Sequence, residues 1–141
     1  MSYDLIKRDI RRDEGLRLKP YKDSVGKISI GYGRNLDDIG ITEEEAEILL
    51  AHDLYNAMQG LDHALPWWRN LDALKQRGLW NMAFNLGVPR LLKFKKMLAA
   101  LQRGDWSAAA DEALDSRWAT QVGDRAKRIA ELFRAEPGKE T

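Results

Sequence analysis

The spacing of apolar residues divides this chain into a helical start, a short segment with a different period, and a long helical remainder. Ser2 can cap a first helix that runs to about Asp13. The apolar face of that helix would consist of Leu5, Ile6 and Ile10. Gly15 would end it, because glycine readily adopts the backbone conformation that stops a helix. Glu14 would therefore lie at a helix C-terminus.

Between residues 16 and 38 the apolar residues no longer follow helical spacing. The short extended stretches LRLKPY and KISIGY are separated by DSVGK and followed by RNLDD, both rich in turn-forming residues. This pattern predicts a small antiparallel hairpin or a three-stranded sheet. Such a sheet is too small to be stable alone, so we expect it to pack against helices.

Helical spacing resumes and continues almost to the end of the chain. Thr42 followed by Glu45 forms a capping box and predicts the start of a long amphipathic helix over about 42–62. Pro66 ends that region. Further helices are predicted at about 71–86, 90–102, 106–114 and 124–134, with glycine or proline between them. The predicted fold class is α+β and mainly α.

Composition limits the classes of protein that fit. The chain has 141 residues, 44% apolar and 32% charged, which is typical of a soluble globular protein. Its 23 basic and 22 acidic residues argue against a protein dedicated to coating nucleic acid. Without cysteine there is neither a disulfide scaffold nor a thiolate metal site. We find no signal-peptide run and no apolar run of membrane-spanning length.

Several common kinds of site are poorly supported. His52 and His63 are eleven residues apart on or near one predicted helix, about 16 Å along its axis, so they cannot share a metal ion. Gly31 and Gly33 resemble the start of a dinucleotide fingerprint, but its third glycine would fall at Leu36, where no helix begins. No GxSxG elbow is present, so a Ser-His-acid set has weak support.

Two acids near the sheet offer a different chemistry. Glycoside hydrolysis needs one protonated carboxyl and one ionised carboxyl. Glu14 would end a helix beside Leu16 and Leu18, where the helix dipole and partial desolvation favour the protonated form. Asp23 would lie on a polar turn that favours the ionised form, and the Ser29 hydroxyl could share a water with it. Solvated surface acids are the alternative, because the chain contains 22 acidic residues.

The tryptophans are equally open to two interpretations. They could stack on sugar rings, but tryptophans on helices are more typical of a core. They are Trp67, Trp68, Trp80, Trp106 and Trp118.

The segment EGLRLKPYKDSVGKISIGYGR, residues 14–34, is similar to the signature of the phage-type (T4-like) lysozyme and endolysin family, the muramidases. The blocks EGLRLK, YKD and IGYG have the same order and spacing. The resemblance continues in ITEEEAEILLAHD, in WNMAFNLG and in SRWATQVGDRAKRI, so matching blocks cover about residues 10–134. The resemblance implies one lysozyme-like domain, 1–141, in which a long helix joins a small antiparallel β lobe, about 15–41, to a helical bundle lobe, 1–14 and 42–135.

The resemblance also implies catalytic roles. Glu14 would be the general acid, Asp23 the carboxylate that directs a water to the opposite face of the sugar, and Ser29 a hydroxyl that helps to hold that water. The reaction would invert the anomeric carbon, with the two carboxyl groups about 6.5–9.5 Å apart. Ser29 departs from the family's usual threonine. Its side chain lacks the β-branch that restricts the rotamer, so water positioning would be looser.

The family's substrate-binding positions carry over to Arg34, Asn85, Phe94, Gln121 and Arg125. Arg125 would approach and orient Glu14. Arg34 stands where histidine occurs in the family, and we hypothesise an ion pair between Arg34 and Asp53 that ties the small sheet to the long helix. Ordinary helix caps or a solvated helix face are the alternative interpretation of these positions.

The resemblance implies a peptidoglycan hydrolase that cleaves the β-1,4 bond between N-acetylmuramic acid and N-acetylglucosamine without metal or organic cofactor. We expect bacterial peptidoglycan as its partner, no nucleic acid, no stable membrane association, and a monomer. The missing signal peptide is consistent with an endolysin that stays in the host cytoplasm until the membrane is permeabilised.

Three alternatives stay open. The first is an inactive glycan-binding relative, because Ser29 alters the water site. The second is a lytic transglycosylase, which uses a single glutamate and no water. The third is a helical nucleic-acid binder, for which the basic groups would be Lys93, Lys95, Lys96 and the run RAKR at 125–128.

Overall fold

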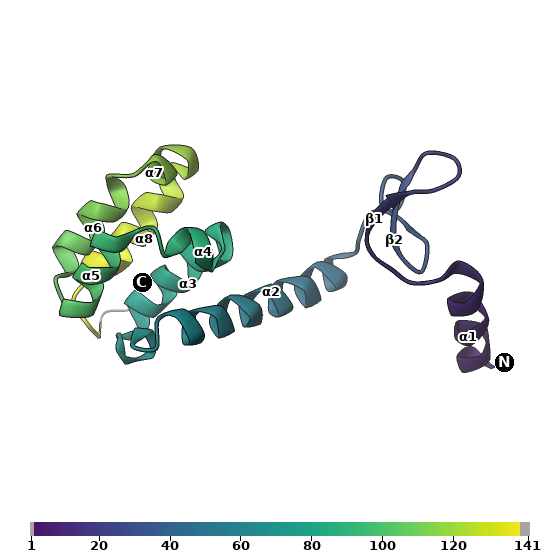
Figure 1. Ribbon diagram of the computed structural model, residues 1–141, viewed down its shortest axis with the longest axis horizontal. Coiled ribbons are helices and arrows are strands. Elements are labelled where there is room, and N and C mark those ends of the chain that lie inside the picture. Colours follow the sequence, from purple (N-terminus) through teal and green to yellow (C-terminus); the bar gives the residue numbers. More distant parts are fainter. Residues whose placement is uncertain (1, 139–141) are drawn as a thin grey trace. The chain divides into compact units, whose positions relative to one another are not determined.

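The computed structural model describes residues 2–138, and these form a mainly helical structure with one small antiparallel sheet. The predicted α+β class is confirmed. The chain forms two compact units, one up to Leu49 and one from Leu50 (Figure 1). We describe the units separately.

The first unit contains a helix, three strands and the beginning of a second helix. The elements are α1 (Tyr3–Glu14), β1 (Arg17–Lys22), β2 (Ile28–Gly31), β3 (Arg34–Asn35) and the start of α2 (Glu43–Ala64). The Ser2 side chain accepts a hydrogen bond from the Leu5 N–H, and Gly15 follows the helix at φ 73°, as predicted. Glu14 is the last residue of α1.

The sheet has the order β1-β2-β3, so β2 is its central strand. Tyr21 and Asn35 face Ser29 from the two neighbouring strands. The β1–β2 register shifts between Arg17 and Tyr21, which marks a bulge or similar irregularity in the ladder. Ser29 therefore has a hydrogen-bonded strand on each side of its own strand, and it is only 2% exposed.

The predicted capping box opens α2. The Glu45 N–H donates to Thr42 Oγ1 over 3.1 Å, and the Thr42 N–H donates back to Glu45 Oε1 over 2.9 Å. The same Glu45 carboxylate accepts one hydrogen bond from each terminal nitrogen of Arg34, each over 2.7 Å. The predicted ion pair between Arg34 and Asp53 is therefore wrong. The capping glutamate is the partner, because its two oxygens match the planar guanidinium.

The second unit is a bundle of helices that follows the C-terminal part of α2. It contains η1 (Trp68–Asn70), α3 (Ala73–Leu86), α4 (Val88–Leu91), α5 (Lys95–Arg103), α6 (Trp106–Leu114), α7 (Arg117–Val122) and α8 (Asp124–Arg134). Helices at 71–86, 106–114 and 124–134 are confirmed. Figure 1 shows α5, α6 and α8 side by side, and α8 also packs against α3.

The prediction of one helix over 90–102 is wrong. The chain leaves helical geometry at Phe94, whose ψ of 58° separates α4 from α5. The turn is closed by backbone hydrogen bonds from Lys93 to Arg90 and from Phe94 to Leu91. Helix α7 was not predicted; it has only six residues and follows the capping Ser116.

The core lies among the helices of the second unit. Its largest fully buried side chains are Trp68, Lys75, Phe133, Leu61, Leu79, Met82, Leu91, Met97, Leu101 and Ile129. Helices α3 and α8 approach closely at Gly78, where an added Cβ would lie 2.7 Å from a ring carbon of Phe133. Glycine at this position therefore lets the two helices meet over a buried aromatic ring.

A cluster of polar contacts fixes the end of α2 to η1. Asp62 accepts hydrogen bonds from Arg69 Nε over 2.6 Å and from Trp68 Nε1 over 2.7 Å. These bonds, from Arg69 first and then Trp68, lower the pKa of Asp62 to about 2. The buried indole of Trp68 thus has its N–H satisfied at the edge of the core.

In the part of the chain that the structure describes, no helix is both long and apolar enough to cross a membrane. The same residues contain no group of three or more His, Asp or Glu side chains placed to hold a metal ion.

The contact between Arg34 and Glu45 predicts a measurable dependence of stability on pH. Hydrogen bonds from Arg34 and from the Thr42 backbone lower the pKa of Glu45 from 4.5 to about 2. A lowered pKa in the folded state means that the contribution is present above pH 4.5 and is lost as the pH falls towards 2. We expect Glu45→Gln to lower Tm modestly at pH 7, because the pair is partly exposed, with a difference from the unmodified protein that shrinks between these two pH values.

Thermal unfolding at a series of pH values checks this expectation. A Tm difference that stays constant from pH 7 to pH 2 would contradict the role assigned to the ion pair. Glu44→Gln, at an exposed neighbouring acid on α2, is the matched control.

Candidate active site and relatives

Glu14 lies beside the backbone of the glycine turn that follows β2. A Cβ added to Gly33 would be 3.2 Å from Glu14 Oε2, and Gly33 has φ 88°. The carboxyl of the last residue of α1 therefore packs against the loop between β2 and β3. Two features of this position require glycine: its positive φ, and the Glu14 carboxyl, which leaves little room for a Cβ.

The surroundings of Glu14 differ from the expectation in one respect. Leu16 and Leu18 were expected to desolvate its carboxyl, but they are 54% and 80% exposed, and the Glu14 side chain is itself exposed. The prediction of partial burial by these two leucines is wrong. They lie on either side of Arg17, at the start of β1, and the ladder register shifts between Arg17 and Tyr21.

Asp23 is held in the turn between β1 and β2. Its Oδ1 accepts hydrogen bonds from the Val25 N–H over 3.0 Å and the Lys27 N–H over 2.9 Å. Its backbone N–H also donates to the Lys27 carbonyl over 2.8 Å. Backbone donors stabilise the ionised carboxylate and fix its orientation, and its second oxygen has no bond from this turn. The predicted polar turn is confirmed.

Ser29 lies on the central strand, directly opposite Tyr21 on β1. Asp23 comes two residues after Tyr21, directly after the end of β1, so the turn that carries the carboxylate joins β1 to the strand of the hydroxyl. The first unit therefore holds all three predicted catalytic residues on the end of α1, the β1–β2 turn and β2.

Asn85 and Phe94 are brought together by Trp118, one of the tryptophans for which the sequence left sugar stacking and the core as alternatives. The Trp118 indole N–H donates to Asn85 Oδ1 over 2.8 Å, and the Trp118 ring meets Phe94 edge-to-face at 6.0 Å. Trp118 is buried. Asn85 thus has a structural partner, and its side-chain NH2 group is left for other contacts.

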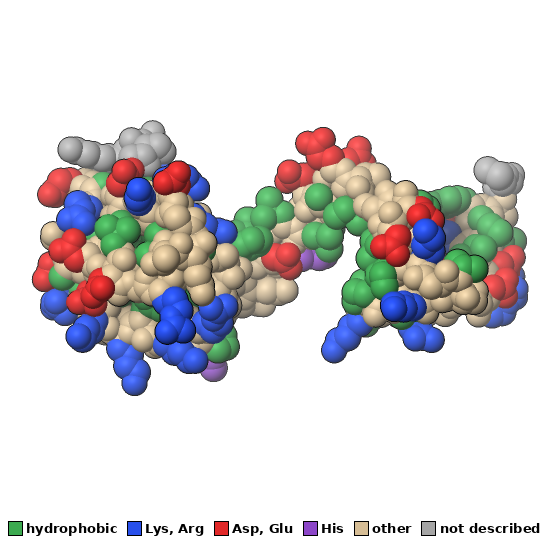
Figure 2. Space-filling model, turned by 90° about the horizontal axis from the view of Figure 1, so that it is seen from above, with side chains coloured by type: hydrophobic (Ala, Val, Ile, Leu, Met, Phe, Trp, Pro, Cys, Tyr) green, Lys and Arg blue, Asp and Glu red, His purple; other side chains and the backbone are tan. Residues whose placement is uncertain are grey.

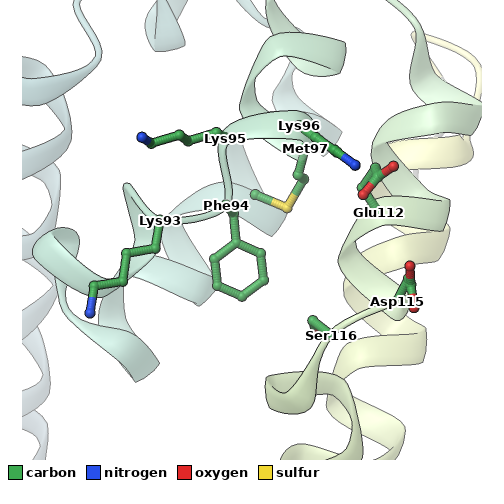
Figure 3. A pocket seen from close by; sticks show the side chains of 8 residues that line it. All are labelled: Lys93, Phe94, Lys95, Lys96, Met97, Glu112, Asp115 and Ser116. Atoms are coloured by element: carbon green, nitrogen blue, oxygen red, sulfur yellow. The ribbon is translucent and has the colours of Figure 1, made fainter.

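Phe94 also lines an open pocket of about 400 Å³ (Figure 3). Figure 3 shows its ring and the Met97 side chain between the start of α5 and the end of α6, with Lys96 extending towards Glu112. Lys93 and Lys95, in contrast, extend away from the acidic side chains. On the face drawn in Figure 2, basic and acidic side chains are interspersed over the helical unit.

Arg125, at the start of α8, donates through Nε to Asn81 Oδ1 over 2.8 Å. Both residues line a groove of about 390 Å³ together with Trp80 and Phe84. Arg125 belongs to the second unit and Glu14 to the first, so the predicted approach of Arg125 to Glu14 stays a prediction. Gln121 is exposed near the end of α7.

Two residues of this groove could have been found from the sequence. Asn81 and Phe84 belong to the WNMAFNLG block, in which Asn81 lies four residues before Asn85 and Phe84 lies four residues after Trp80. That spacing places them on neighbouring positions of the surface of α3. The hydrogen bond that joins Asn81 to Arg125 spans 44 residues, and no local pattern predicts it.

Comparison with known protein families finds one matching family model, "Phage lysozyme", over residues 11–135. The match contains all the predicted catalytic and substrate-binding residues, and it covers both compact units.

Individual relatives agree with this match. The chain is 35% identical to "Pre-baseplate central spike protein Gp5" of Enterobacteria phage T4, over 88% of this chain but 26% of that protein, so it spans about a quarter of that relative's length. It is 29% identical to "Probable T4-type lysozyme 2" of Dictyostelium discoideum, over 96% of both chains. It is 32% identical to an "Endolysin" of Acyrthosiphon pisum secondary endosymbiont phage 1, over 73% of this chain and 70% of that protein.

The family model covers most of the chain, and the segment that carries the Glu14, Asp23 and Ser29 pattern lies inside it. The chain belongs to the phage lysozyme family.

Proposed function

We propose that this protein is a muramidase, which hydrolyses the β-1,4 bond between N-acetylmuramic acid and N-acetylglucosamine in bacterial peptidoglycan with inversion at the anomeric carbon. Bacterial cell lysis for phage release is the biological role that we propose for it. Membership of the phage lysozyme family supports the substrate class. Glu14, Asp23 and Ser29 support the reaction.

One observation carries this proposal. The Glu14 carboxyl lies against Gly33, in the turn that joins β2, the strand of Ser29, to β3. Asp23 is fixed in the turn before β2, at the opposite end of this strand. A general acid needs a fixed position relative to the group that directs the water. The small sheet supplies this position, because all three residues are attached to the same strands or to the helix end that meets them.

Each residue then has a defined step. Glu14 donates its proton to the glycosidic oxygen as the bond from that oxygen to the anomeric carbon breaks. A water held by Asp23 and Ser29 attacks the anomeric carbon from the opposite face, and its proton passes to Asp23. The Glu14 side chain is exposed, so its carboxyl is open to a sugar bound over it.

The polar groups of the second unit are suited to holding the glycan. The free NH2 group of Asn85 and the amide of Gln121 can bond hydroxyl and N-acetyl groups, which offer both donors and acceptors. Phe94 offers an apolar ring. Arg125, held by Asn81, would orient Glu14 or a substrate oxygen. Arg34 already bonds Glu45 and the Gly40 carbonyl, so we propose that it shapes the end of β3 towards the substrate.

The relatives suggest two settings for the same chemistry. Two of the relatives described above are a free-standing lysozyme of nearly equal length and an endolysin. The endolysin relative supports a role in host-cell lysis, and we further propose a monomer that leaves the host cytoplasm through a permeabilised membrane. The T4 spike relative is about four times longer, so use of such a domain within a larger virion protein is the second candidate.

Removal of the proposed general acid tests the function. We expect Glu14→Gln to lower the rate of peptidoglycan clearance about 10²–10⁴-fold, because a neutral amide cannot donate the proton. The measurement is turbidity loss of purified cell walls. Asp13→Asn is the matched control, because Asp13 is the preceding exposed acid and pairs only with its neighbour Arg12 among the described residues. Equal activity in both variants would reject Glu14 as the acid.

The close approach at Gly33 gives a second prediction. Gly33→Ala and Gly31→Ala both place alanine at a positive φ, 88° and 72°, so both are strained. An added Cβ meets Glu14 only at Gly33 and has nothing within 4 Å at Gly31. We therefore expect similar losses of Tm in the two variants but a much larger loss of kcat in Gly33→Ala. If kcat falls equally in both, strain alone explains the effect and the contact with Glu14 has no catalytic importance.

A further inference from the structure

The five tryptophans fall into two groups by their hydrogen bonds. The indole N–H groups of Trp68, Trp80 and Trp118 donate to Asp62, the Leu54 carbonyl and Asn85. Within residues 2–138, the N–H groups of Trp67 and Trp106 have no acceptor. Both of these side chains are half-buried, so their unpaired N–H groups can reach solvent. Tryptophans that serve only the core usually satisfy this donor.

These two tryptophans line the same pocket. Trp67 lies just before η1 and Trp106 is the first residue of α6, yet both border an open cavity of about 490 Å³. Its wall also contains the polar side chains of Asn70, Asp72, Gln102 and Arg103, and the apolar residues Leu71, Leu101 and Pro137. The volume is within the range of small-ligand sites. None of these residues has a role in the proposed hydrolysis.

A buried lysine fixes two walls of this pocket. Lys75 is fully buried, and its ammonium lies 3.3 Å from Asp72 Oδ2 and 4.8 Å from the centre of the Trp106 ring. Its Nζ also donates to the Ala135 carbonyl. Asp72 is further held as the N-cap of α3. A pocket whose walls are fixed before binding loses less conformational entropy when a ligand enters.

The chemistry of the wall matches one class of ligand. Indole faces offer flat apolar surface, while the indole N–H groups, two amides and a carboxylate offer donors and acceptors around it. A sugar ring has the complementary form, with C–H groups on its faces and hydroxyl or N-acetyl groups at its rim. The two charged residues of the pocket wall, Asp72 and Arg103, are already paired with Lys75 and Asp105, which disfavours a strongly charged ligand.

We propose that this pocket of Trp67, Asn70, Asp72, Gln102 and Trp106 binds one sugar unit of the glycan strand, as an attachment site that takes no part in bond cleavage. This inference rests on the proposed function, because it takes the glycan of peptidoglycan as the ligand. The site would hold the enzyme on its polymeric substrate between cleavage events. Its loss would affect long strands and leave short fragments unaffected.

Binding to intact polymer tests the proposal. Trp67→Ala, Trp106→Ala and Gln102→Ala are made in the Glu14→Gln background, so that the glycan stays uncut. Co-sedimentation with purified cell walls measures Kd, with soluble N-acetylglucosamine oligosaccharide as competitor. We expect each tryptophan variant to bind about tenfold more weakly, since loss of a stacking ring costs about 1.4 kcal/mol. Trp67→Phe should restore most of the binding, because it keeps an aromatic face.

Activity assays separate this proposal from the proposed function. In proteins that retain Glu14, the pocket variants should cleave short soluble oligosaccharides at the unmodified rate but clear cell walls more slowly. Gln59→Ala removes an exposed amide from α2, away from the pocket, and is the control for Gln102→Ala. Circular dichroism and Tm confirm that each variant is folded, and Gln102→Ala tests the site without disturbing the packing of an indole.

Each outcome has one meaning. If the unmodified protein cuts neither cell walls nor oligosaccharides, the proposed function fails. If it cuts both but the folded pocket variants bind cell walls as well as their parent, the attachment site is rejected. If binding weakens but the sugar does not compete, the pocket binds another component of the wall and the sugar assignment is wrong.

Discussion

The contact between Glu14 and the turn at Gly33 is the constraint on which the rest of the candidate site depends. It joins the end of α1 to the sheet, and through the sheet it relates Glu14 to the strand that carries Ser29. Asp23 is fixed separately, by backbone donors within its own turn. The unit therefore uses two local devices, a glycine without a side chain and a turn closed on a carboxylate, to orient its acids.

The helices contribute through contacts of a different kind. Glu45 both caps α2 and binds Arg34, so one carboxylate attaches the last strand of the sheet to the helix that follows it. In the second unit, Trp118 connects Asn85 on α3 with Phe94 before α5, and Arg125 connects α8 with Asn81. Side chains that face the groove and the pocket are thus held by partners from other helices, which keeps them ordered without burying their polar atoms.

Local patterns predicted the elements that depend on local forces. The capping residues Ser2, Thr42 and Asp105 each receive the predicted bond, and the helix over 106–114 was placed correctly. The short extended stretches and the turn-forming residues between them likewise predicted the small sheet. The break at Phe94 was missed because no glycine or proline marks it, and the helix at Arg117–Val122 was missed because six residues carry little periodicity. Family spacing, and not periodicity, selected Glu14 and Asp23 from 22 acids.

Long-range partners could not be predicted in the same way. The sequence offers several acids on the long helix as partners for Arg34. We predicted Asp53, whereas the partner is the capping Glu45, which is nearer along the chain. Leu16 and Leu18 proved exposed, and no local pattern of the segment predicts this. Trp67, just before η1, and Trp106, at the start of α6, share a pocket although they lie 39 residues apart along the chain, and no motif connects them.

The configuration of the first product tests the central claim most directly. Digestion of purified peptidoglycan can be followed by NMR at early times, and the products can be analysed by mass spectrometry after reaction in ¹⁸O-labelled water. Acid/base hydrolysis by Glu14 and Asp23 predicts reducing ends that carry one ¹⁸O and appear first as the α-anomer. Anhydromuramyl ends without label, or an initial β-anomer, would contradict the roles assigned to Asp23 and Ser29.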